Sequence, residues 1–243
     1  MSASNIKYYP DVLQGSELWF QLRTGILTAS EMKNVINHNL EPVKPTKKDA
    51  ERGKDIRHLY DMLAQRITNY TEPSYISDDM LRGKEDEIHA KIAYSANYAP
   101  IQDMGFITND KWGFTIGFSP DGLVGDDGLV EGKSRKYKYQ IETILDNSMP
   151  SDFLVQVQTG LMVSERKWCD FISYPAYGGT EMLTVRVEAD KNAQDAIIAA
   201  AFDFERRLAE KLKQYNDIVA SGKARLIKTE RRVAETLMEG ETV

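Results

Sequence analysis

Three residues near the middle of the chain have the types and spacing needed to cut a phosphodiester bond. Glu131 and Lys133 lie in the segment GLVEGKS, and Asp121 precedes them in SPDG. Residues two apart on a strand share a face, and a hairpin return would bring Asp121 beside Glu131. Two carboxylates and the Gly132 carbonyl are the oxygen ligands that Mg²⁺ prefers. Lys133 could position or help deprotonate a metal-bound water, so we expect metal-assisted phosphoryl-transfer chemistry here.

The same segment also resembles a nucleotide-binding loop that ends in Gly-Lys-Ser. That loop needs four residues between its first glycine and the Gly-Lys pair, whereas three separate Gly128 from Gly132. Counting back four places reaches Asp127, and Asp126 and Glu131 add negative charge that would repel a triphosphate. A simpler alternative is an SPDG turn followed by a surface Glu–Lys pair. We expect Asp126 and Asp127 to be turn residues only.

Composition limits the class of protein. The chain has 243 residues, 42% hydrophobic and 28% charged, which is typical of one large globular domain or two small ones. No apolar run is long enough for a membrane span, and the first residues lack the apolar core of a signal peptide. The single Cys169 can form neither an internal disulfide nor a cysteine cage for zinc or an iron–sulfur cluster. A reducing cytoplasm is expected, and the net charge of −6 still permits a local basic groove.

The segment before Asp121, Glu131 and Lys133 is expected to be mostly helical. Residues 16–37 suggest two helices separated by a turn at Thr24-Gly25, with Thr28 to Glu31 as a capping box for the second. Residues 40–50 are expected to form an exposed loop because they are rich in proline and lysine. Apolar spacing predicts helices over 51–70 and over 79–96, the latter through Met80, Ile88, Ile92 and Ala93.

The period then changes to that of strands. Segments 111–118 and 128–133 are expected to form a hairpin through a Gly/Asp-rich turn. The resulting pattern of helices, a mostly antiparallel sheet, one central helix and further helices is α/β or α+β in a single domain. Beyond the hairpin we expect a helix opened by Pro150-Ser151, strands at 167–174 and 181–188, a long helix over 190–219, and a basic segment after Gly222 that leads into a last short helix.

Five motifs together make the chain resemble a known family. They are W-x-x-L-R-x-G-x-x-T-A-S at 19–30, G-x-x-x-E at 83–87, S-P-D-G at 119–122, E-x-K at 131–133 and Q-V-Q at 156–158. In this order and approximate spacing, over roughly 15–190, the chain resembles the lambda-type phage exonucleases. These form the YqaJ viral recombinase family of the PD-(D/E)xK nuclease superfamily.

The resemblance implies a role for each motif. A terminal phosphate suits an arginine fork with hydroxyl groups around it, although Arg23 could instead be a surface cation and Ser30 a helix cap. The implied metal ligands are Asp121, Glu131, Gly132 through its carbonyl, and Glu87. Lys133 would act on the attacking water and Gln156 would brace the lysine, while Arg23, Ser30 and Ser119 would bind the phosphate at the 5′ end of DNA.

Two departures from the family follow Glu131. The family usually has an apolar residue where this chain has Gly132, and glycine weakens a strand and lets another backbone approach. The family also often continues with an apolar pair, whereas here the run Arg135-Lys136-Tyr137-Lys138 follows Ser134. Arg135, Lys136 and Lys138 suit DNA phosphates, and a solvated charged turn is the alternative.

As a whole, the resemblance implies a PD-(D/E)xK, restriction-endonuclease-like core with a mixed central sheet flanked by helices. Residues 1–243 would form a single nuclease domain, with a helical 5′-end-binding motif at about 15–37 and C-terminal helices at about 190–240. The implied activity is a 5′→3′ exonuclease on linear double-stranded DNA that uses Mg²⁺, with Mn²⁺ as a possible substitute. It would leave a 3′ single strand for recombination.

The resemblance also implies partners, and other functions remain open. Expected partners are double-stranded DNA ends, a single-strand annealing protein and two further subunits of a homotrimeric ring, with no membrane. The place of action would be the cytoplasm of a bacterial host, for a protein of phage or prophage origin. A restriction-like endonuclease with the same metal core is one alternative, and a catalytically silent DNA-binding or scaffold protein is another.

Overall fold

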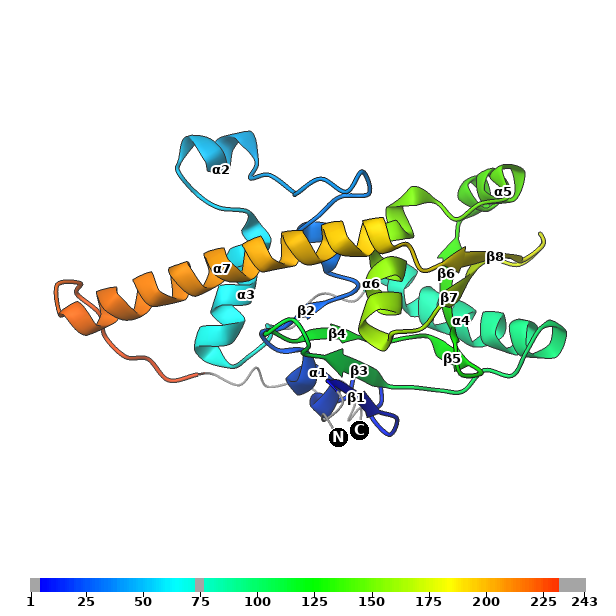
Figure 1. Cartoon of the computed structure of the whole chain (residues 1–243), viewed down its shortest axis with the longest axis horizontal. Helices are drawn as coiled ribbons and strands as arrows, with labels where there is room; N and C mark the ends of the chain where they lie inside the picture. Colours follow the sequence, from blue (N-terminus) through cyan, green and yellow to red (C-terminus); the bar gives the residue numbers. More distant parts are fainter. Residues whose placement is uncertain (1–4, 73–76, 232–243) are drawn as a thin grey trace, which may run out of the picture.

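The computed structural model describes residues 5–72 and 77–231, and its described part contains two four-stranded sheets (Figure 1). The first sheet has the strand order β1-β3-β4-β2 and the second has β5-β6-β7-β8. The strands are β1 (Ile6–Tyr9), β2 (Leu27–Thr28), β3 (Phe106–Asn109), β4 (Ile116–Phe118), β5 (Gly122–Val124), β6 (Gly128–Arg135), β7 (Trp168–Pro175) and β8 (Leu183–Glu188).

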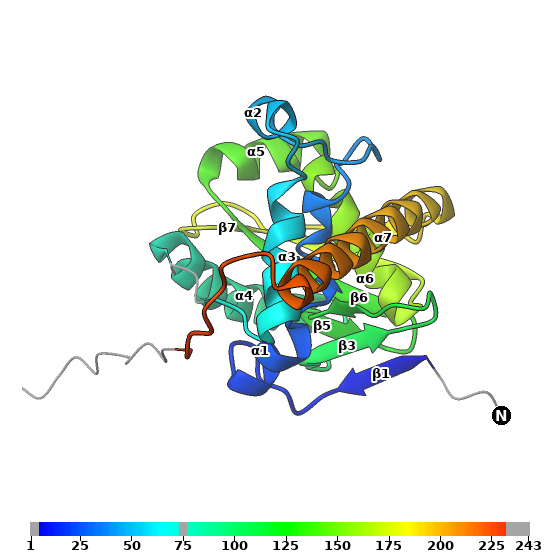
Figure 2. The same cartoon turned by 90° about the vertical axis from the view of Figure 1, so that its left-hand side faces the viewer.

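Helices cover both sheets. The long α7 packs across α3 and α6, and its second half extends beyond them (Figure 1). The chain after α7 turns back toward α3 (Figure 2). The helices are α1 (Glu17–Arg23), α2 (Lys47–Glu51), α3 (Arg57–Thr68), α4 (Asp78–Asn97), α5 (Tyr137–Asp146), α6 (Leu154–Ser164) and α7 (Lys191–Ser221), with 3₁₀ turns at Met32–Asn34 and Ser151–Phe153.

Both sheets are mixed, which differs from the mostly antiparallel sheet expected. β2 pairs in parallel with β4, and β6 pairs in parallel with β7 along its whole length. The expected hairpin between 111–118 and 128–133 is wrong, because β4 pairs with β3 and the short β5 makes the hairpin with β6. A mixed α/β architecture is therefore present, but the strands divide into two sheets instead of one central sheet.

Strand β6 lies between two groups of core residues. The first four residues of β6 are buried on both faces, which requires a helix on each side. On one side Val130 joins Ala90 and Tyr94 of α4, and on the other Leu129 joins a larger core with α3, α6 and α7. The second half of β6, from Gly132 onward, is half-buried and emerges at the edge of this core.

Two helix predictions need correction. No second helix covers 26–37 in the described residues, because Leu27 and Thr28 form β2 and Thr28 therefore caps no helix. Helix α4 matches the expected range, but most of the apolar residues whose spacing predicted it do not face the core. Met80, Ile88 and Ile92 are 50–62% exposed, whereas Asp86, Ala90 and Tyr94 are buried.

The remaining helices and strands follow the expected pattern more closely. Helices α3, α6 and α7 and strands β7 and β8 occur close to their expected ranges. The proline-rich loop is interrupted by the short α2. The last predicted helix lies in residues 232–243, outside the described part, and residues 223–231 before it are not helical. Among the helices described, none has the length and apolar character needed to cross a membrane.

Candidate active site

Strand β6 carries a row of three functional side chains. Glu131, Lys133 and Arg135 alternate with Gly132 and Ser134, so they share one face of the strand. The Lys133 ammonium donates to Glu131 Oε1 at 2.5 Å, although Glu131 is only 2% exposed. The acid and the lysine of the E-x-K motif are thus in direct contact.

Gln156 reaches this row from α6. Its Nε2 donates to Glu131 Oε1 at 2.5 Å, the same oxygen that accepts from Lys133. The resemblance led us to expect that Gln156 braces the lysine. In the structure Gln156 holds the carboxylate, and it acts on Lys133 only through Glu131.

Asp121 approaches from the start of β5. The β5–β6 register places Gly122 opposite Val130, so Asp121 comes opposite Glu131. The Gly132 backbone N–H donates to Asp121 Oδ2 at 2.7 Å. The expected juxtaposition of the two carboxylates is therefore present, although it comes from β5 and not from the 111–118 strand.

Glu87 of α4 joins these groups electrostatically. Burial raises the pKa of Glu87 to about 7, with Asp121 adding to the rise and Lys91 opposing it. Burial likewise raises the pKa of Glu131 to about 7, against the opposing charge of Lys133, and it also raises the pKa of Asp121. Each carboxylate makes ionisation of the others more costly, which is the electrostatic condition that a bound cation relieves.

The same carboxylates favour the charged form of the lysine, whereas they disfavour the charged form of one another. Burial alone would lower the pKa of Lys133, but the charges of Glu131 and Asp121 raise it above its ordinary value. Lys133 is therefore held as an ammonium ion. An ammonium in this place can orient a water molecule or donate to a phosphate oxygen.

The donor set fits a hard divalent cation. Asp121, Glu131 and Glu87 supply carboxylate oxygens, and Gly132 supplies a carbonyl oxygen next to Glu131. The fit is one of chemical type only, because among the residues that the structure describes no group of three or more His, Cys, Asp or Glu side chains is arranged to hold a metal ion. Glu131 and Asp121 instead accept hydrogen bonds from Lys133, Gln156 and the Gly132 N–H.

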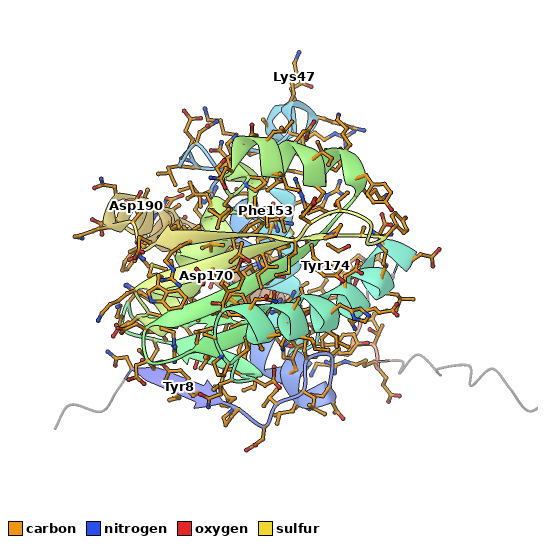
Figure 3. The ribbon with its side chains drawn as sticks, turned by 90° about the vertical axis from the view of Figure 1, so that its right-hand side faces the viewer. Tyr8, Lys47, Phe153, Asp170, Tyr174 and Asp190 are labelled. Atoms are coloured by element: carbon orange, nitrogen blue, oxygen red, sulfur yellow. The ribbon has the colours of Figure 1, made fainter. Side chains whose placement is uncertain are left out.

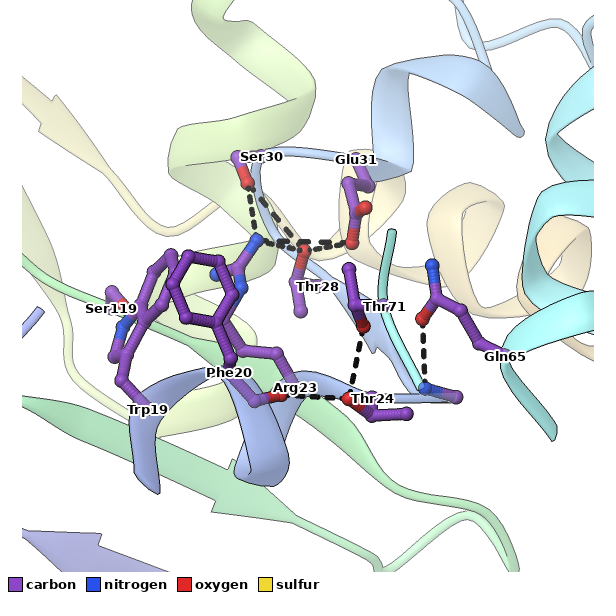
Figure 4. Close-up of polar contacts among 11 residues, drawn as sticks. Trp19, Phe20, Arg23, Thr24, Thr28, Ser30, Glu31, Gln65, Thr71 and Ser119 are labelled. Atoms are coloured by element: carbon purple, nitrogen blue, oxygen red, sulfur yellow. Dashed lines mark hydrogen bonds and ion pairs between the residues drawn. The ribbon is translucent and has the colours of Figure 1, made fainter. Parts of the chain in front are cut away.

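A second group of residues surrounds Arg23 (Figure 4), and we call it the Arg23 cluster. Arg23 Nη2 lies 3.2 Å from Thr28 Oγ1 and 3.4 Å from Ser30 Oγ. Its Cζ lies 4.3 Å from the Trp19 ring centroid, and Trp19 Nε1 donates to Ser119 Oγ at 2.8 Å. All three residues assigned to the terminal phosphate therefore gather in one place, with Trp19 and Thr28 between them.

The local fold explains why Arg23 is held there. Arg23 is in the last turn of α1, and Gly25 then reverses the chain with a φ of 75°, which glycine adopts without strain. The Gly25 N–H donates to Gln65 and its carbonyl accepts from Arg66, both on α3. The turn after Arg23 is thus fixed to the core.

The Arg23 cluster also contains a carboxylate, Glu31, which is unexpected in a group suited to binding phosphate. A Glu31 oxygen lies 3.9 Å from Arg23 Nη2, and Thr28 Oγ1 donates to Glu31 Oε2 at 2.5 Å. Burial lowers the pKa of Arg23, and Glu31 partly offsets this. No phosphate-binding role was assigned to Trp19, Thr28 or Glu31 from sequence, where Thr28 and Glu31 were expected to form a capping box. Trp19 and Arg23 do have the i, i+4 spacing of side chains that meet on a helix.

The three cations that follow Lys133 differ in the groups that they contact. The Arg135 Cζ lies 5.2 Å from the Tyr139 ring centroid and 5.4 Å from that of Phe153. Within the described residues, the Arg135 side chain makes no ion pair and no hydrogen bond. Lys136 pairs with Asp79 at 3.0 Å, and the exposed Lys138 lies 3.8 Å from Glu142. Lys136 is the N-cap of α5 and Lys138 lies in its first turn, so this segment starts a helix, and both lysines are exposed to solvent.

Solved structures of nucleases resemble this fold. The alkaline exonuclease LHK-Exo from Laribacter hongkongensis matches with a TM-score of 0.72 at 28% identity, covering 85% of this chain and 99% of that one. The same protein in complex with dAMP matches with a TM-score of 0.71 at 29% identity, covering 86% and 100%. A phage-related exonuclease from Haemophilus somnus 129PT shares the fold at 14% identity and a TM-score of 0.50, covering 77% and 96%. No curated protein matches significantly.

The family is established by a direct match. The model of the YqaJ-like viral recombinase domain covers residues 18–167, which is more than half of the chain. The chain belongs to the YqaJ-like viral recombinase family, and the resemblance read from the five motifs is confirmed.

Proposed function

We propose that this protein is a Mg²⁺-dependent exonuclease that digests linear double-stranded DNA from its 5′ ends and leaves a 3′ single strand for recombination by annealing. One observation carries the proposal. Trp19 joins Arg23 to Ser119, and Ser119 lies two residues before Asp121. A cluster suited to a terminal phosphate and a site suited to phosphodiester hydrolysis thus share the segment 119–121.

Similar proteins support the same activity. The family is described as viral recombinase, and two of the matched structures are of an alkaline exonuclease, one of them holding dAMP. A nucleoside monophosphate is the expected product of an exonuclease. We extend exonuclease activity on DNA to this chain, with a PD-(D/E)xK core formed by β5, β6 and α6 and by α4, which carries Glu87.

Each residue of the site has a part in this proposal. Asp121, Glu131, Gly132 through its carbonyl, and Glu87 would hold Mg²⁺, and Mn²⁺ could replace it because both ions accept oxygen ligands. The bound ion would polarise the phosphodiester and offset the charge of the transition state. Lys133, kept as an ammonium, orients the attacking water and donates to phosphate oxygen. Gln156 fixes the Glu131 carboxylate against α6.

The Arg23 cluster would select the end of the DNA. Arg23 offers several N–H donors, and Ser30, Thr28 and Ser119 offer hydroxyl groups. A 5′-terminal phosphate held there would place the next phosphodiester bond toward Asp121. Arg135, Lys136 and Lys138 would contact DNA phosphates further along, with Arg135 the strongest because no carboxylate pairs with it in the described part of the chain.

Digestion of defined duplexes tests the proposal. Linear DNA with a 5′-phosphate, linear DNA with a 5′-hydroxyl and covalently closed circular DNA would each be incubated with Mg²⁺ and with EDTA. We expect loss of 5′-labelled nucleotides from linear DNA, faster with the phosphate, and no digestion in EDTA. Nicking of the circle at a similar rate would favour a restriction-like endonuclease. No cleavage of any substrate in Mg²⁺ or Mn²⁺ would favour a silent DNA-binding protein.

A further inference from the structure

Three exposed tyrosines lie beside the β6 site, on segments that are far apart in the sequence. Tyr137 and Tyr139 belong to the first turn of α5, and Tyr177 belongs to the turn between β7 and β8. Their exposed fractions are 47%, 46% and 63%, so these rings do not serve the core. Tyr137 and Tyr177 are neighbours, with ring centroids 5.8 Å apart. Tyr139 is two positions from Tyr137 on α5, so it faces a different side of the helix from the Tyr137–Tyr177 pair. We call Tyr137, Tyr139 and Tyr177 together the tyrosine surface, which therefore has two parts.

Cations accompany these rings. Arg82 of α4 lies 5.1 Å from the Tyr177 ring centroid, and its Nη1 lies 3.2 Å from the Tyr177 hydroxyl. Arg135 and Lys138 lie 5.2 Å and 5.5 Å from the Tyr139 ring centroid. Asp79 neutralises part of this charge because it pairs with both Arg82 and Lys136. Arg135 makes no such pair among the described residues.

Phe153 connects this surface with the β6 site. Its ring centroid lies 5.8 Å from Lys133 Nζ and 5.4 Å from Arg135 Cζ, and the ring packs against Phe171 of β7 at 5.1 Å. Figure 3 shows Phe153 beneath α5, over the strands of the second sheet. The line from Lys133 through Phe153 and Arg135 to Tyr139 is therefore continuous.

We propose that the tyrosine surface binds unpaired bases of single-stranded DNA next to the β6 site, with Arg135 holding a backbone phosphate between Tyr139 and Phe153. Exposed aromatic rings interleaved with cations are the arrangement that single-strand-binding grooves use, because every base offers a face for stacking. A duplex keeps its bases stacked inside and can offer the rings only its backbone. This inference rests on the proposed function, in that digestion of one strand leaves the other strand unpaired here.

Binding measured in EDTA tests the surface without cleavage. The probes are a 5′-hydroxyl oligothymidylate, the same sugar–phosphate chain with abasic sites, and a blunt duplex, each followed by fluorescence anisotropy. For Tyr139→Ala and Tyr177→Ala we expect affinity for oligothymidylate to fall roughly 5- to 100-fold, the range for loss of one stacked base. Affinity for the abasic chain should be weak already and should change less than twofold.

Matched variants separate stacking from folding. Tyr215→Ala removes a tyrosine of similar exposure, 43%, from the projecting half of α7 and should leave all three affinities unchanged. Tyr139→Phe should keep the affinity that Tyr139→Ala loses, because the ring remains. Circular dichroism melts of every variant identify any loss of folding.

Three outcomes would overturn the proposal. Equal losses for the duplex and the single strand would mean that the surface holds duplex backbone. Equal affinity of the unmodified protein for the abasic and base-containing chains would mean that no base stacks. A change in oligomer mass without a change in single-strand affinity would assign the tyrosines to a subunit contact. Absence of nuclease activity in Mg²⁺ would count against the proposed function alone.

Discussion

We expect the fold to survive removal of either Lys133 or Asp121. Without Lys133, Glu131 keeps the hydrogen bond from Gln156 and can take up a proton, since its pKa is already raised to about 7. Without Asp121, one backbone N–H loses its acceptor, which costs about 1–3 kcal/mol. We therefore expect Lys133→Ala and Asp121→Ala to fold and to lose cleavage by roughly 100-fold or more, measured on a labelled duplex alongside a thermal melt.

A surface lysine provides the control for this pair. Lys213→Ala removes a cation of α7 that pairs with Asp217 one turn away, and it should leave cleavage unchanged. If both site variants kept near-normal activity, the assignment of Asp121 and Lys133 to the chemistry would be wrong. If both failed to fold, the residues would be structural.

Arg23 should govern the choice of DNA end more than it governs the metal. Its guanidinium contacts Trp19, Thr28 and Ser30. Trp19 in turn donates a hydrogen bond to Ser119. We expect Arg23→Ala to reduce the preference for 5′-phosphorylated over 5′-hydroxyl ends by about tenfold or more, which is the loss of one charge-assisted hydrogen bond. The Mg²⁺ concentration for half-maximal activity should stay within about twofold.

Arg206→Ala is the matched control, because Arg206 lies on α7 and pairs only with its helix neighbours Asp203 and Glu210 among the described residues. The comparison is made by competition between the two ends in one reaction. Equal digestion of both ends by the unmodified protein would remove the phosphate role from the Arg23 cluster.

Gly132 is not required by the shape of the strand. A Cβ added there would meet, among the described atoms, only Asp121 Oδ2 at the ordinary contact distance of 3.7 Å. A Cβ on Gly128 of the same strand would lie 2.1 Å from the Trp168 ring. We expect Gly132→Ala to change unfolding free energy by no more than about 0.5 kcal/mol and Gly128→Ala to destabilise by about 1–3 kcal/mol.

Urea unfolding of the two glycine variants measures this difference directly. The family usually has an apolar residue where this chain has Gly132, and the open space beside it is consistent with that preference. No other backbone atom lies within 4 Å of that Cβ position among the described atoms, so on this side of the strand the close approach of another backbone is absent. A large loss of stability in Gly132→Ala alone would show that the strand needs the smaller residue.

At the scale of elements, Arg66 ties three segments together. It belongs to α3, its Nε donates to the Gly25 carbonyl at 2.8 Å, and its Nη2 pairs with Glu205 of α7 at 2.7 Å. Arg66→Ala leaves the Glu205 carboxylate, 12% exposed, without its cation. We expect a loss of about 2 kcal/mol in unfolding free energy, together with a weaker preference for 5′-phosphorylated ends because the turn after Arg23 is released.

The same two measurements on the Arg206→Ala variant calibrate this effect. A stability loss without any change in end preference would show that the Gly25 turn keeps its position through Gln65 alone. No change in stability would mean that the Arg66–Glu205 pair contributes nothing net.

Elements with strong periodicity were predictable from sequence, and short ones were not. The apolar stripe of α7 and the alternation of β7 are long enough to reveal their type. Strands β2 and β5 have two and three residues, too few for any period to emerge. Their pairing partners, β4 and β6, are decided by tertiary packing. Helix α5 was missed because its first turn is a basic and aromatic run.

The grouping of the candidate site residues was predictable where strand geometry brings two motifs together, and not where helix packing chooses a residue's partner. The Asp121–Glu131 juxtaposition followed from strand geometry, although the intervening β5 did not. The attachment of Gln156 to Glu131 depends on how α6 packs, and Glu31 beside Arg23 depends on a turn that was expected to be helical. The outward stripe of α4 was misjudged because a buried Asp86, held by Ser134, replaces an apolar residue on its inner face.

For the whole molecule, we propose that residues 1–243 form a single nuclease domain. We further propose that three copies form a ring and that the ring acts together with a single-strand annealing protein. The C-terminal segment is the candidate docking surface for the annealer. Leu226 and Ile227 there are 59% and 90% exposed, beside several basic residues. Arg231 instead contacts the end of α3 through the Thr68 carbonyl, and the Tyr70 ring just after that helix. Part of this segment therefore packs on its own chain.

Deleting residues 223–243 tests this surface. We expect nuclease activity to stay within about twofold, because α7 and the site remain, and co-purification of the annealer to be lost. Leu226→Ser with Ile227→Ser is the milder variant, since Arg231 keeps its contacts. Unchanged co-purification would exclude the segment as the docking surface. A fall in oligomer mass, measured by light scattering, would assign it to contact between subunits.

Several bonds that join the N-terminal elements to later ones span long stretches of chain. Trp19 and Ser119 are 100 positions apart, Arg66 and Glu205 are 139 apart, and Arg207 and Asp55 are 152 apart. Contacts between distant positions carry a loop-closure cost before they return any stability, so such folds form slowly. We expect the N-terminal elements to reach their final packing only after α7 has been synthesised. A polypeptide that stops before α7 would carry all five motifs without the ion pairs that tie α7 to Arg66 and Asp55.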